Sequence, residues 1–242
     1  DNYNLVINAV TNFVNIIFNS VISSFGNLIA TETKERQYEL FQVYRFFASW
    51  VYGFAVTGFF VLLTPLVRIW LGDAWVLPAS AVTLILIDLY FKGDRIVLSN
   101  YKTAAGVFEQ DKYLALIQGG VNLVLSIWLV QKIGLAGIYV GTVISGLIAN
   151  LTKPVIIYRV CFGRSSRSYF AESLRYAGTV AVLAAGLKLV GNRVMAQPAI
   201  GSFLLMVVII TLVFNGVFLL LFGRSREFRY LKQVALKKLG KV

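Results

Sequence analysis

The amino-acid sequence predicts an all-α integral membrane protein with about seven transmembrane helices. Hydrophobic residues make up 58% of the 242 residues, and the mean hydropathy is +0.74. Charged residues make up only 14%, against about 25% in a typical soluble domain. Apolar stretches long enough to cross a bilayer, which takes roughly 20 helical residues, recur with short polar breaks.

The expected spans follow one another along most of the chain. The last is the most uniform, because residues 203–222 read FLLMVVIITLVFNGVFLLLF. The fourth and fifth are separated only by residues 131–134, so we expect them to form a tight helical hairpin. The seven expected spans are 4–30, 44–71, 79–104, 113–131, 135–160, 172–192 and 199–223.

Basic residues are distributed unevenly among the loops. The net charge of +12 raises the question of nucleic acid, but basic residues between apolar runs are typical of cytoplasmic loops, and no nucleic-acid partner is expected. In the set of loops with few basic residues, the loop at 72–78 has none, and the other two contain Lys132 and Arg193. The richer set has Lys34, Arg36, Arg45, Lys112, Arg159, Arg164, Arg167 and the tail from Arg224 to Lys241. The positive-inside rule therefore predicts a multi-pass protein of the cytoplasmic (inner) membrane, with the C-terminus cytoplasmic and residue 1 outside.

The tail, residues 224–242, mixes apolar and basic residues. This pattern predicts an amphipathic helix lying on the inner leaflet of the membrane. A regulatory or partner-binding tail is the alternative. Because residue 1 is Asp and no signal-peptide pattern precedes the first apolar run, we also expect the chain to be a piece of a longer protein.

The residue types that most enzymes depend on are scarce. Histidine is absent and Cys161 is the only cysteine, so the sequence offers no internal disulfide, no His/Cys metal site and no Ser/His triad. No Walker loop is present either. The sequence therefore predicts a protein that is not an enzyme and that needs no cofactor or metal.

The first expected span carries a row of asparagines. Steps of three or four residues place them on one side of a helix. An amide in hydrocarbon needs a partner, so this face must meet either other helices through hydrogen bonds or a wet cavity; both alternatives stay open. The row is Asn4, Asn8, Asn12, Asn15 and Asn19, continued by Ser23 and Asn27.

The third expected span carries a row of charges. Asp88, Lys92, Arg95, Ser99 and Lys102 share one helix face, and Asp94 lies off it. Charges near the bilayer centre usually face the interior of a helix bundle and mark a functional site. The alternatives are a structural Asp88–Lys92 pair and a lysine, Lys102, that reaches the membrane surface. Neither accounts for Arg95, so we favour a cationic strip that lines a cavity and suits an anionic group such as phosphate.

The fourth and fifth spans carry weaker signals. The fourth has Gln118, Asn122 and Ser126 on one face. The fifth has small residues at every fourth position, which favours close helix packing, and a lysine, Lys153, expected near the cytoplasmic boundary. The small residues are Gly137, Gly141, Ser145 and Ala149.

Three stretches together resemble a known superfamily. Residues 122–145, NLVLSIWLVQKIGLAGIYVGTVIS, resemble a helical hairpin of the multidrug/oligosaccharidyl-lipid/polysaccharide exporter superfamily. Residues 103–113, TAAGVFEQDKY, and residues 2–32 resemble its polysaccharide flippase branch. The resemblance covers about 1–162, and the later residues match only as two further hydrophobic spans.

The resemblance implies a fold and a division of the chain. Residues 1–162 would be the C-terminal lobe of a two-lobed, MATE-like bacterial transporter, 163–223 two additional transmembrane helices, and 224–242 the basic cytoplasmic tail. It implies translocation of a polyprenyl-pyrophosphate-linked oligosaccharide from the cytoplasmic to the outer leaflet for surface polysaccharide biosynthesis. Implied partners are that lipid-linked substrate, membrane lipids, a missing N-terminal lobe and the polysaccharide polymerase machinery.

The resemblance also implies roles for residues. Basic cavity residues of such flippases are thought to meet the pyrophosphate, and the asparagines would meet the sugar. Asp88 or Asp94 would take part in ion coupling. The expected substrate-binding residues are Arg95, Lys92, Lys102, Asn8, Asn12, Asn15, Asn19 and Asn122.

Three other functions stay open at this point. A multidrug or cation exporter of the same superfamily would favour acidic cavity residues, whereas this face is net basic. A seven-span receptor fits the expected number of spans. A glycosyl or acyl transferase is disfavoured, because histidine and paired carboxylates at the cytoplasmic face are absent.

Overall fold

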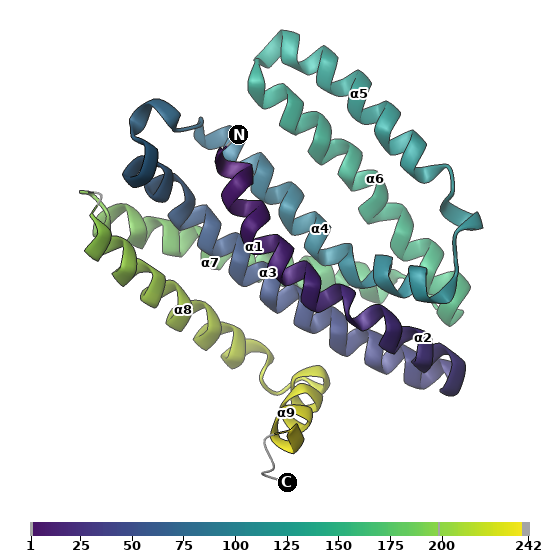
Figure 1. Ribbon diagram of the computed structural model, residues 1–242. Helices are drawn as coiled ribbons and strands as arrows, with labels where there is room; N and C mark the ends of the chain where they lie inside the picture. The colour runs from purple at the N-terminus through teal and green to yellow at the C-terminus, as the bar shows by residue number, and fades with distance from the viewer. Residues whose placement is uncertain (1, 198, 239–242) are drawn as a thin grey trace.

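The computed structural model describes residues 2–197 and 199–238, and in this part of the chain it contains helices and no strand (Figure 1). Predictions that concern residue 1 and residues 239–242 lie outside the described residues. The α-helices are α1 (Asn2–Asn19), α2 (Val21–Thr31), α3 (Lys34–Leu71), α4 (Ala79–Ala105), α5 (Leu114–Ile133), α6 (Leu135–Phe162), α7 (Arg167–Val194), α8 (Ile200–Phe222) and α9 (Arg226–Lys238). Two short 3-10 helices are η1 (Asp73–Trp75) and η2 (Glu109–Asp111).

Six helical segments in the described chain are long and apolar enough to cross a membrane, which indicates a multi-pass α-helical membrane protein. They are Asn2–Thr31, Lys34–Leu71, Glu109–Ile133, Leu135–Phe162, Arg167–Val194 and Ile200–Phe222. The sequence predicted about seven. The difference is α4, whose 27 residues are enough to span but include the charged side chains of the predicted cationic strip.

The first two expected spans differ most from the prediction. The first expected span is two helices with a break at Ser20, whose hydroxyl donates to the Ile17 carbonyl at 2.7 Å. Such bonds from serine to the preceding turn compete with the helical backbone and bend helices. The second span begins ten residues earlier than expected, because the Thr33 side chain caps α3 by accepting from the backbone N–H of Arg36.

The early start of α3 overturns one assignment. Arg45, which the sequence analysis counted among the loop residues, lies about three turns inside α3. Its side chain is 1% exposed. The loop assignment of Arg45 is therefore wrong, and a buried arginine in a bundle needs partners.

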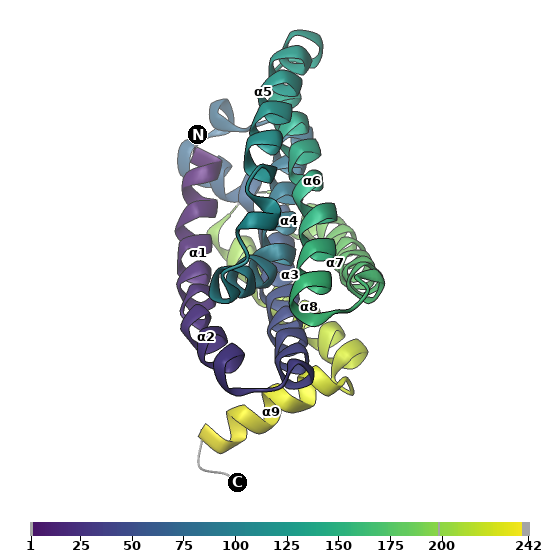
Figure 2. The ribbon, with the colours of Figure 1, turned by 90° about the vertical axis from the view of Figure 1, so that its right-hand side faces the viewer.

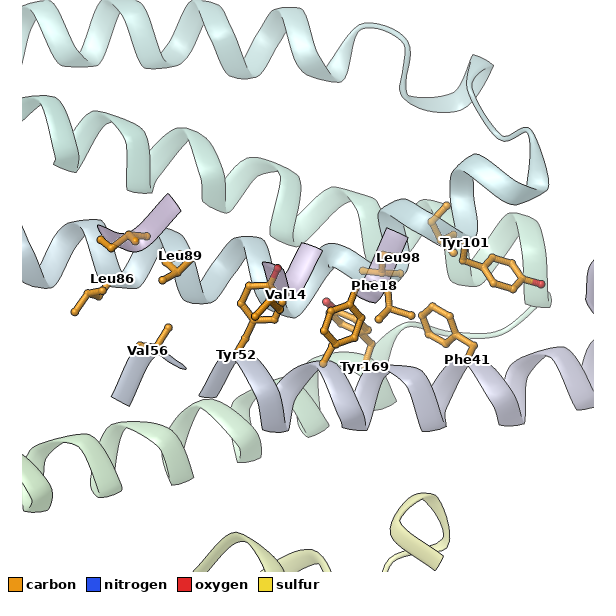
Figure 3. Close-up of a cluster of buried hydrophobic side chains, with 14 of the residues drawn as sticks. Val14, Phe18, Phe41, Tyr52, Val56, Leu86, Leu89, Leu98, Tyr101 and Tyr169 are labelled. Carbon is orange, nitrogen blue, oxygen red and sulfur yellow. The ribbon is translucent and has the colours of Figure 1, made fainter. Parts of the chain in front are cut away.

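Helix α3 is the centre of the bundle. It contacts α1, α4, α7, α8 and α9, while α4 lies between α3 and α6 (Figures 1 and 2). The buried side chains between α1, α3 and α4 include Phe18, Phe41, Tyr52, Leu89 and Tyr101 (Figure 3). This core fixes the position of α1 against α4, the two helices that carried the polar rows in the sequence.

The α5–α6 hairpin has the predicted tight turn. Gly134 alone separates the two helices, with a positive φ of 66° that glycine adopts without strain. The small residues Gly137 and Gly141 face α5 across the hairpin, so their predicted packing role is confirmed. Helix α5 packs mainly on α6 and contributes no buried residue, which leaves its outer face apolar and exposed.

The helices alternate between two ends of the bundle (Figures 1 and 2). One end holds the α2–α3, α4–α5 and α6–α7 connections together with α9; we call it the basic end. Its residues include Lys34, Lys112, Arg164 and Arg167. The opposite end holds the start of α1, the segment from Gly72 to Pro78, the turn at Gly134 and the connection between α7 and α8.

Candidate functional site

A polar cavity of about 380 Å³ lies between α1 and α4. Its apolar lining comes from Ile7, Ile85, Leu89 and Ile96. Its polar lining comes from Asn4, Asn8, Thr11, Asn12, Asn15, Tyr52, Asp88, Lys92, Arg95 and Ser99. The two polar rows that the sequence analysis found separately therefore face one space.

The helical repeat explains why the asparagines line the cavity. The buried stripe of α1 is Tyr3, Ile7, Thr11, Val14 and Phe18. Each asparagine from Asn4 to Asn19 follows one of these residues directly, so it lies about 100° further round the helix, at the margin of the packed face. The amides of Asn8 and Asn12 are exposed at the cavity.

On the α4 side, Asp88 and Lys92 form an ion pair with a distance of 2.7 Å between Oδ2 and Nζ. Asp88 is 13% exposed, whereas the Lys92 side chain is 59% exposed. The sequence analysis weighed pairing against cavity lining as alternatives. The structure has both, because the paired side chains are part of the cavity wall.

Arg95 extends from α4 to α6. Its Nη1 donates to Asn150 Oδ1 at 2.6 Å and to the Gly146 carbonyl oxygen at 3.3 Å. Within residues 2–197 and 199–238 it makes no ion pair with a carboxylate, and both of these hydrogen bonds go to neutral acceptors. With Lys92 paired to Asp88, the charge of Arg95 leaves the cavity wall with an excess positive charge.

Tyr52 connects the floor of the cavity to its α1 wall. Its hydroxyl donates to Asn15 Oδ1 at 2.6 Å. The ring crosses α4 at Gly93, where a Cβ atom would overlap the ring carbons of Tyr52. This close approach of α3 and α4 therefore requires glycine at position 93.

Three of the predicted substrate-binding residues lie outside this cavity. Asn19 is exposed on α1 and does not line it. Lys102 Nζ pairs with both carboxylate oxygens of Asp111 at the basic end. Asn122 donates to Thr142 and Ser145 within the α5–α6 hairpin, at 3.2 and 3.1 Å. Helix geometry alone predicted that Lys102 lies with Arg95 in the cationic strip. In the structure, Lys102 pairs instead with Asp111, which lies in the connection between α4 and α5.

The two predicted coupling carboxylates lie on opposite sides of α4. Asp88 faces the polar cavity, and Asp94 faces α7, where it accepts hydrogen bonds from Tyr169 and Ser173. Close to Asp94, Arg45 pairs with Glu172 at 2.6 Å. The sequence analysis did not find the Arg45–Glu172 pair. The available signal was Arg45 among the apolar residues of α3 and a carboxylate, Glu172, near the start of α7.

Among the described residues, no group of three or more His, Cys, Asp or Glu side chains could hold a metal ion. Comparisons with protein-family models, with curated proteins and with solved structures found no match. The physical description of the cavity is therefore what bears on function.

Proposed function

We propose that this chain is part of a membrane transporter that moves a polyprenyl-pyrophosphate-linked oligosaccharide from the cytoplasmic to the outer leaflet, for surface polysaccharide biosynthesis. The observation that carries the proposal is Arg95, an arginine in the wall of a polar cavity that forms no ion pair with a carboxylate in the described chain. Guanidinium groups bind phosphate oxygens through paired hydrogen bonds, and a charge in a membrane bundle needs an anionic or aqueous partner.

The lining of the cavity divides into parts that suit the parts of this substrate. The pyrophosphate would bind Arg95 and Lys92, since both present cationic donors to the same space. The asparagines of α1 offer amide donors and acceptors for sugar hydroxyls. The polyprenyl tail would stay in lipid. A second lobe, expected from the resemblance in sequence, would cover the cavity, and rocking of the two lobes would alternate its access.

The proposed topology has seven crossings, with α4 as the seventh. Helix α4 has 27 residues and lies between two apolar helices, α3 and α6, and its carboxylates Asp88 and Asp94 are largely buried. Because the basic end gathers the basic connections and α9, the positive-inside rule places it in the cytoplasm. Helix α9 would lie there at the headgroups of the inner leaflet. The ring centroid of Phe228 is 5.9 Å from that of Trp50, and Arg229 and Lys232 are exposed.

The charge of the cavity separates this proposal from the nearest alternative. An exporter of cationic drugs would need excess negative charge, whereas Asp88, Lys92 and Arg95 together leave one positive charge in excess. Resistance to cationic dyes conferred by the full protein would favour the exporter. Ligand-dependent signalling without lipid movement would favour a seven-span receptor.

The test is Arg95→Ala in the full protein, reconstituted in liposomes with a fluorescent pyrophosphate-linked lipid oligosaccharide. Hydrogen bonds to charged groups contribute about 1.5–3 kcal/mol, so we expect substrate affinity to fall by about 10- to 100-fold. Arg68→Ala is the matched control, because Arg68 pairs with Asp73 at the opposite end and lies outside the cavity. Equal transfer of the lipid by both variants would rule out this role of Arg95.

A further inference from the structure

Another pocket opens at the basic end, where the connection between α4 and α5 lies beside α6 (Figure 1). Its volume is about 260 Å³, and it shares no lining residue with the polar cavity. We call it the lysine pocket, because three lysines and one carboxylate form its charged wall. These charged residues are Lys102, Asp111, Lys112 and Lys153, and the rest of the wall is Phe108, Leu114, Ala115 and Gln118.

The connection folds so that its carboxylate returns to the end of α4. Gly106 ends α4 with a positive φ of 67°, which glycine adopts without strain, and the chain turns there. The short helix η2 then brings Asp111 to Lys102, whose Nζ donates to the two carboxylate oxygens at 2.8 and 2.7 Å. Only 16% of the Lys102 side chain and 6% of the Asp111 side chain are exposed. This pair is therefore a charge-balanced part of the pocket wall.

The other two lysines leave the pocket with excess positive charge. Lys153 of α6 forms no ion pair within residues 2–197 and 199–238, and its Nζ donates a long hydrogen bond of 3.5 Å to Ser99 Oγ of α4. Lys112 pairs with Glu109 at 3.0 Å. Glu109 is highly exposed and lies outside the pocket wall, so water and salt weaken this pair.

The surroundings of Lys153 favour an anion in the pocket. Its half-buried side chain reaches from α6 to α4, and it interacts electrostatically with Arg95, Lys102 and Asp111. Two of these three groups are cations. A lysine placed among cations in a membrane bundle is costly unless an anion or water accompanies it.

The donors around the pocket suit phosphate. The ammonium groups of Lys112 and Lys153 each carry three donors, and the Gln118 amide adds two more. Hydrogen bonds from a cationic donor to an anionic oxygen are among the strongest in proteins, and lysine is a common phosphate ligand.

The apolar part of the pocket continues onto the surface of α5. Phe108, Leu114 and Ala115 line the pocket, and the next residues of α5, Leu116 and Ile117, are exposed. Because α5 contributes no buried residue, an apolar surface extends from the pocket along the helix. A ligand that joins an anionic head to hydrocarbon chains would contact both surfaces, whereas an inorganic anion would contact only the pocket.

We propose that the lysine pocket binds the phosphate of an anionic phospholipid from the leaflet at the basic end. The phosphate oxygens accept hydrogen bonds from Lys112, Lys153 and Gln118, and the acyl chains lie along the outer face of α5. Basic pockets between transmembrane helices at the cytoplasmic side are known to bind the headgroups of anionic lipids. This lipid belongs to the surrounding bilayer, so the proposal does not rest on the proposed function.

Native mass spectrometry of the full protein in detergent, titrated with dioleoylphosphatidylglycerol, tests the proposal. Dioleoylphosphatidylcholine is the comparison lipid, because it has the same chains and a phosphate but no net charge. We expect one phosphatidylglycerol to bind more tightly than phosphatidylcholine. Lys153→Gln should weaken phosphatidylglycerol binding about tenfold, which corresponds to the loss of one hydrogen bond to a charged group. Lys153→Arg keeps the charge and should keep most of the affinity.

Lys132→Gln is the matched control. It removes the same charge from an exposed lysine at the opposite end of α5, so phosphatidylglycerol should bind as it does to the wild type. Lys112→Gln is a second pocket variant, in an exposed position where folding does not depend on the side chain, and it should weaken binding severalfold. Arg95→Ala should leave this binding unchanged, which separates the outcome from the test of the transported substrate.

Three outcomes would overturn the proposal. The first is equal phosphatidylglycerol affinity in Lys132→Gln and in both pocket variants. The second is equal affinity of the wild type for the two lipids, since the apolar surface of α5 would then account for binding. The third is displacement of the bound lipid by inorganic phosphate as readily as by more phosphatidylglycerol, which would indicate a soluble phosphate as the ligand.

Discussion

At the scale of single residues, the absence of a side chain at position 93 shapes the polar cavity. Tyr52 lies against α4 at Gly93, and its hydroxyl donates to Asn15 of α1 at 2.6 Å. One hydrogen bond thus joins α3 to the α1 wall of the cavity. Because the ring of Tyr52 is itself packed among buried side chains, it has little freedom to move aside.

We therefore expect Gly93→Ala to destabilise the protein, although alanine is the better helix former. Overpacking a buried contact costs about 1–3 kcal/mol, which exceeds the gain of about 1 kcal/mol from helix propensity. Unfolding of the purified protein by heat, followed by circular dichroism, measures the effect. Gly119→Ala is the control, because no atom lies within 4 Å of a Cβ at that position in α5. Equal stability of the two variants would contradict the proposed contact.

Residue patterns predicted one polar site and missed the other. The polar residues of α1 and α4 recur at helical spacing: Asn8, Asn12 and Asn15 in α1, and Lys92 and Arg95 in α4. A polar helix face in a membrane protein must meet protein or water. This requirement explains why the two polar faces line one cavity. The Arg45–Glu172 pair has no such pattern, because neither residue belongs to a polar row at helical spacing and the two are separated by 127 positions. Only the packing of α7 on α3 brings them together.

At the scale of helices, polar ends extend beyond the apolar stretches. Helix α3 has 38 residues, about 57 Å at 1.5 Å per residue, against about 30 Å of hydrocarbon in a bilayer. A search for apolar residues therefore placed its start at residue 44. The helix continues back to Lys34, because Thr33 caps it and α9 packs against it. This projecting part of α3, together with Glu172 and α9, lines a cavity of about 400 Å³ at the basic end.

The α5–α6 hairpin depends on contact between the two backbones. A Cβ at Gly137 would overlap the carbonyl group of Leu129 in α5, and a backbone group cannot rotate away as a side chain can. Because α5 packs mainly on α6, we expect Gly137→Val to separate α5 from the bundle. Faster proteolysis in the connection of residues 106–113 would report the change.

The control for the hairpin is a glycine of α5 that faces away from α6. Gly120→Val introduces the same side chain where no atom lies within 4 Å of the Cβ, so proteolysis should stay at the wild-type rate. If Gly137→Val were as resistant as Gly120→Val, the two helices would not be held by close backbone contact.

At the scale of the whole molecule, the distribution of charge over the two ends argues for an orientation, and α4 decides the number of crossings. If α4 crosses the membrane, the segment before it and the segment after it lie on opposite sides. Its charges allow this crossing, since Asp88 pairs with Lys92 and Asp94 accepts two hydroxyl donors inside the bundle. Sequence hydropathy alone undervalues such a helix, because it counts each charge separately and not the partners that offset it, whether within α4 or on α7.

Cysteine labelling tests this topology in sealed cells with a thiol reagent that does not cross membranes. In a Cys161→Ser background, which removes the only native thiol, single cysteines replace the exposed residues Ala74, Gln110 and Ser165. We expect Ala74→Cys to react from outside, and Gln110→Cys and Ser165→Cys to react only after permeabilisation, because they lie at the basic end. Labelling of Ala74→Cys and Gln110→Cys from the same side would mean that α4 does not cross. The cationic wall of the cavity would then lie at the membrane surface, and the proposed path for a lipid-linked pyrophosphate through the bundle would be excluded.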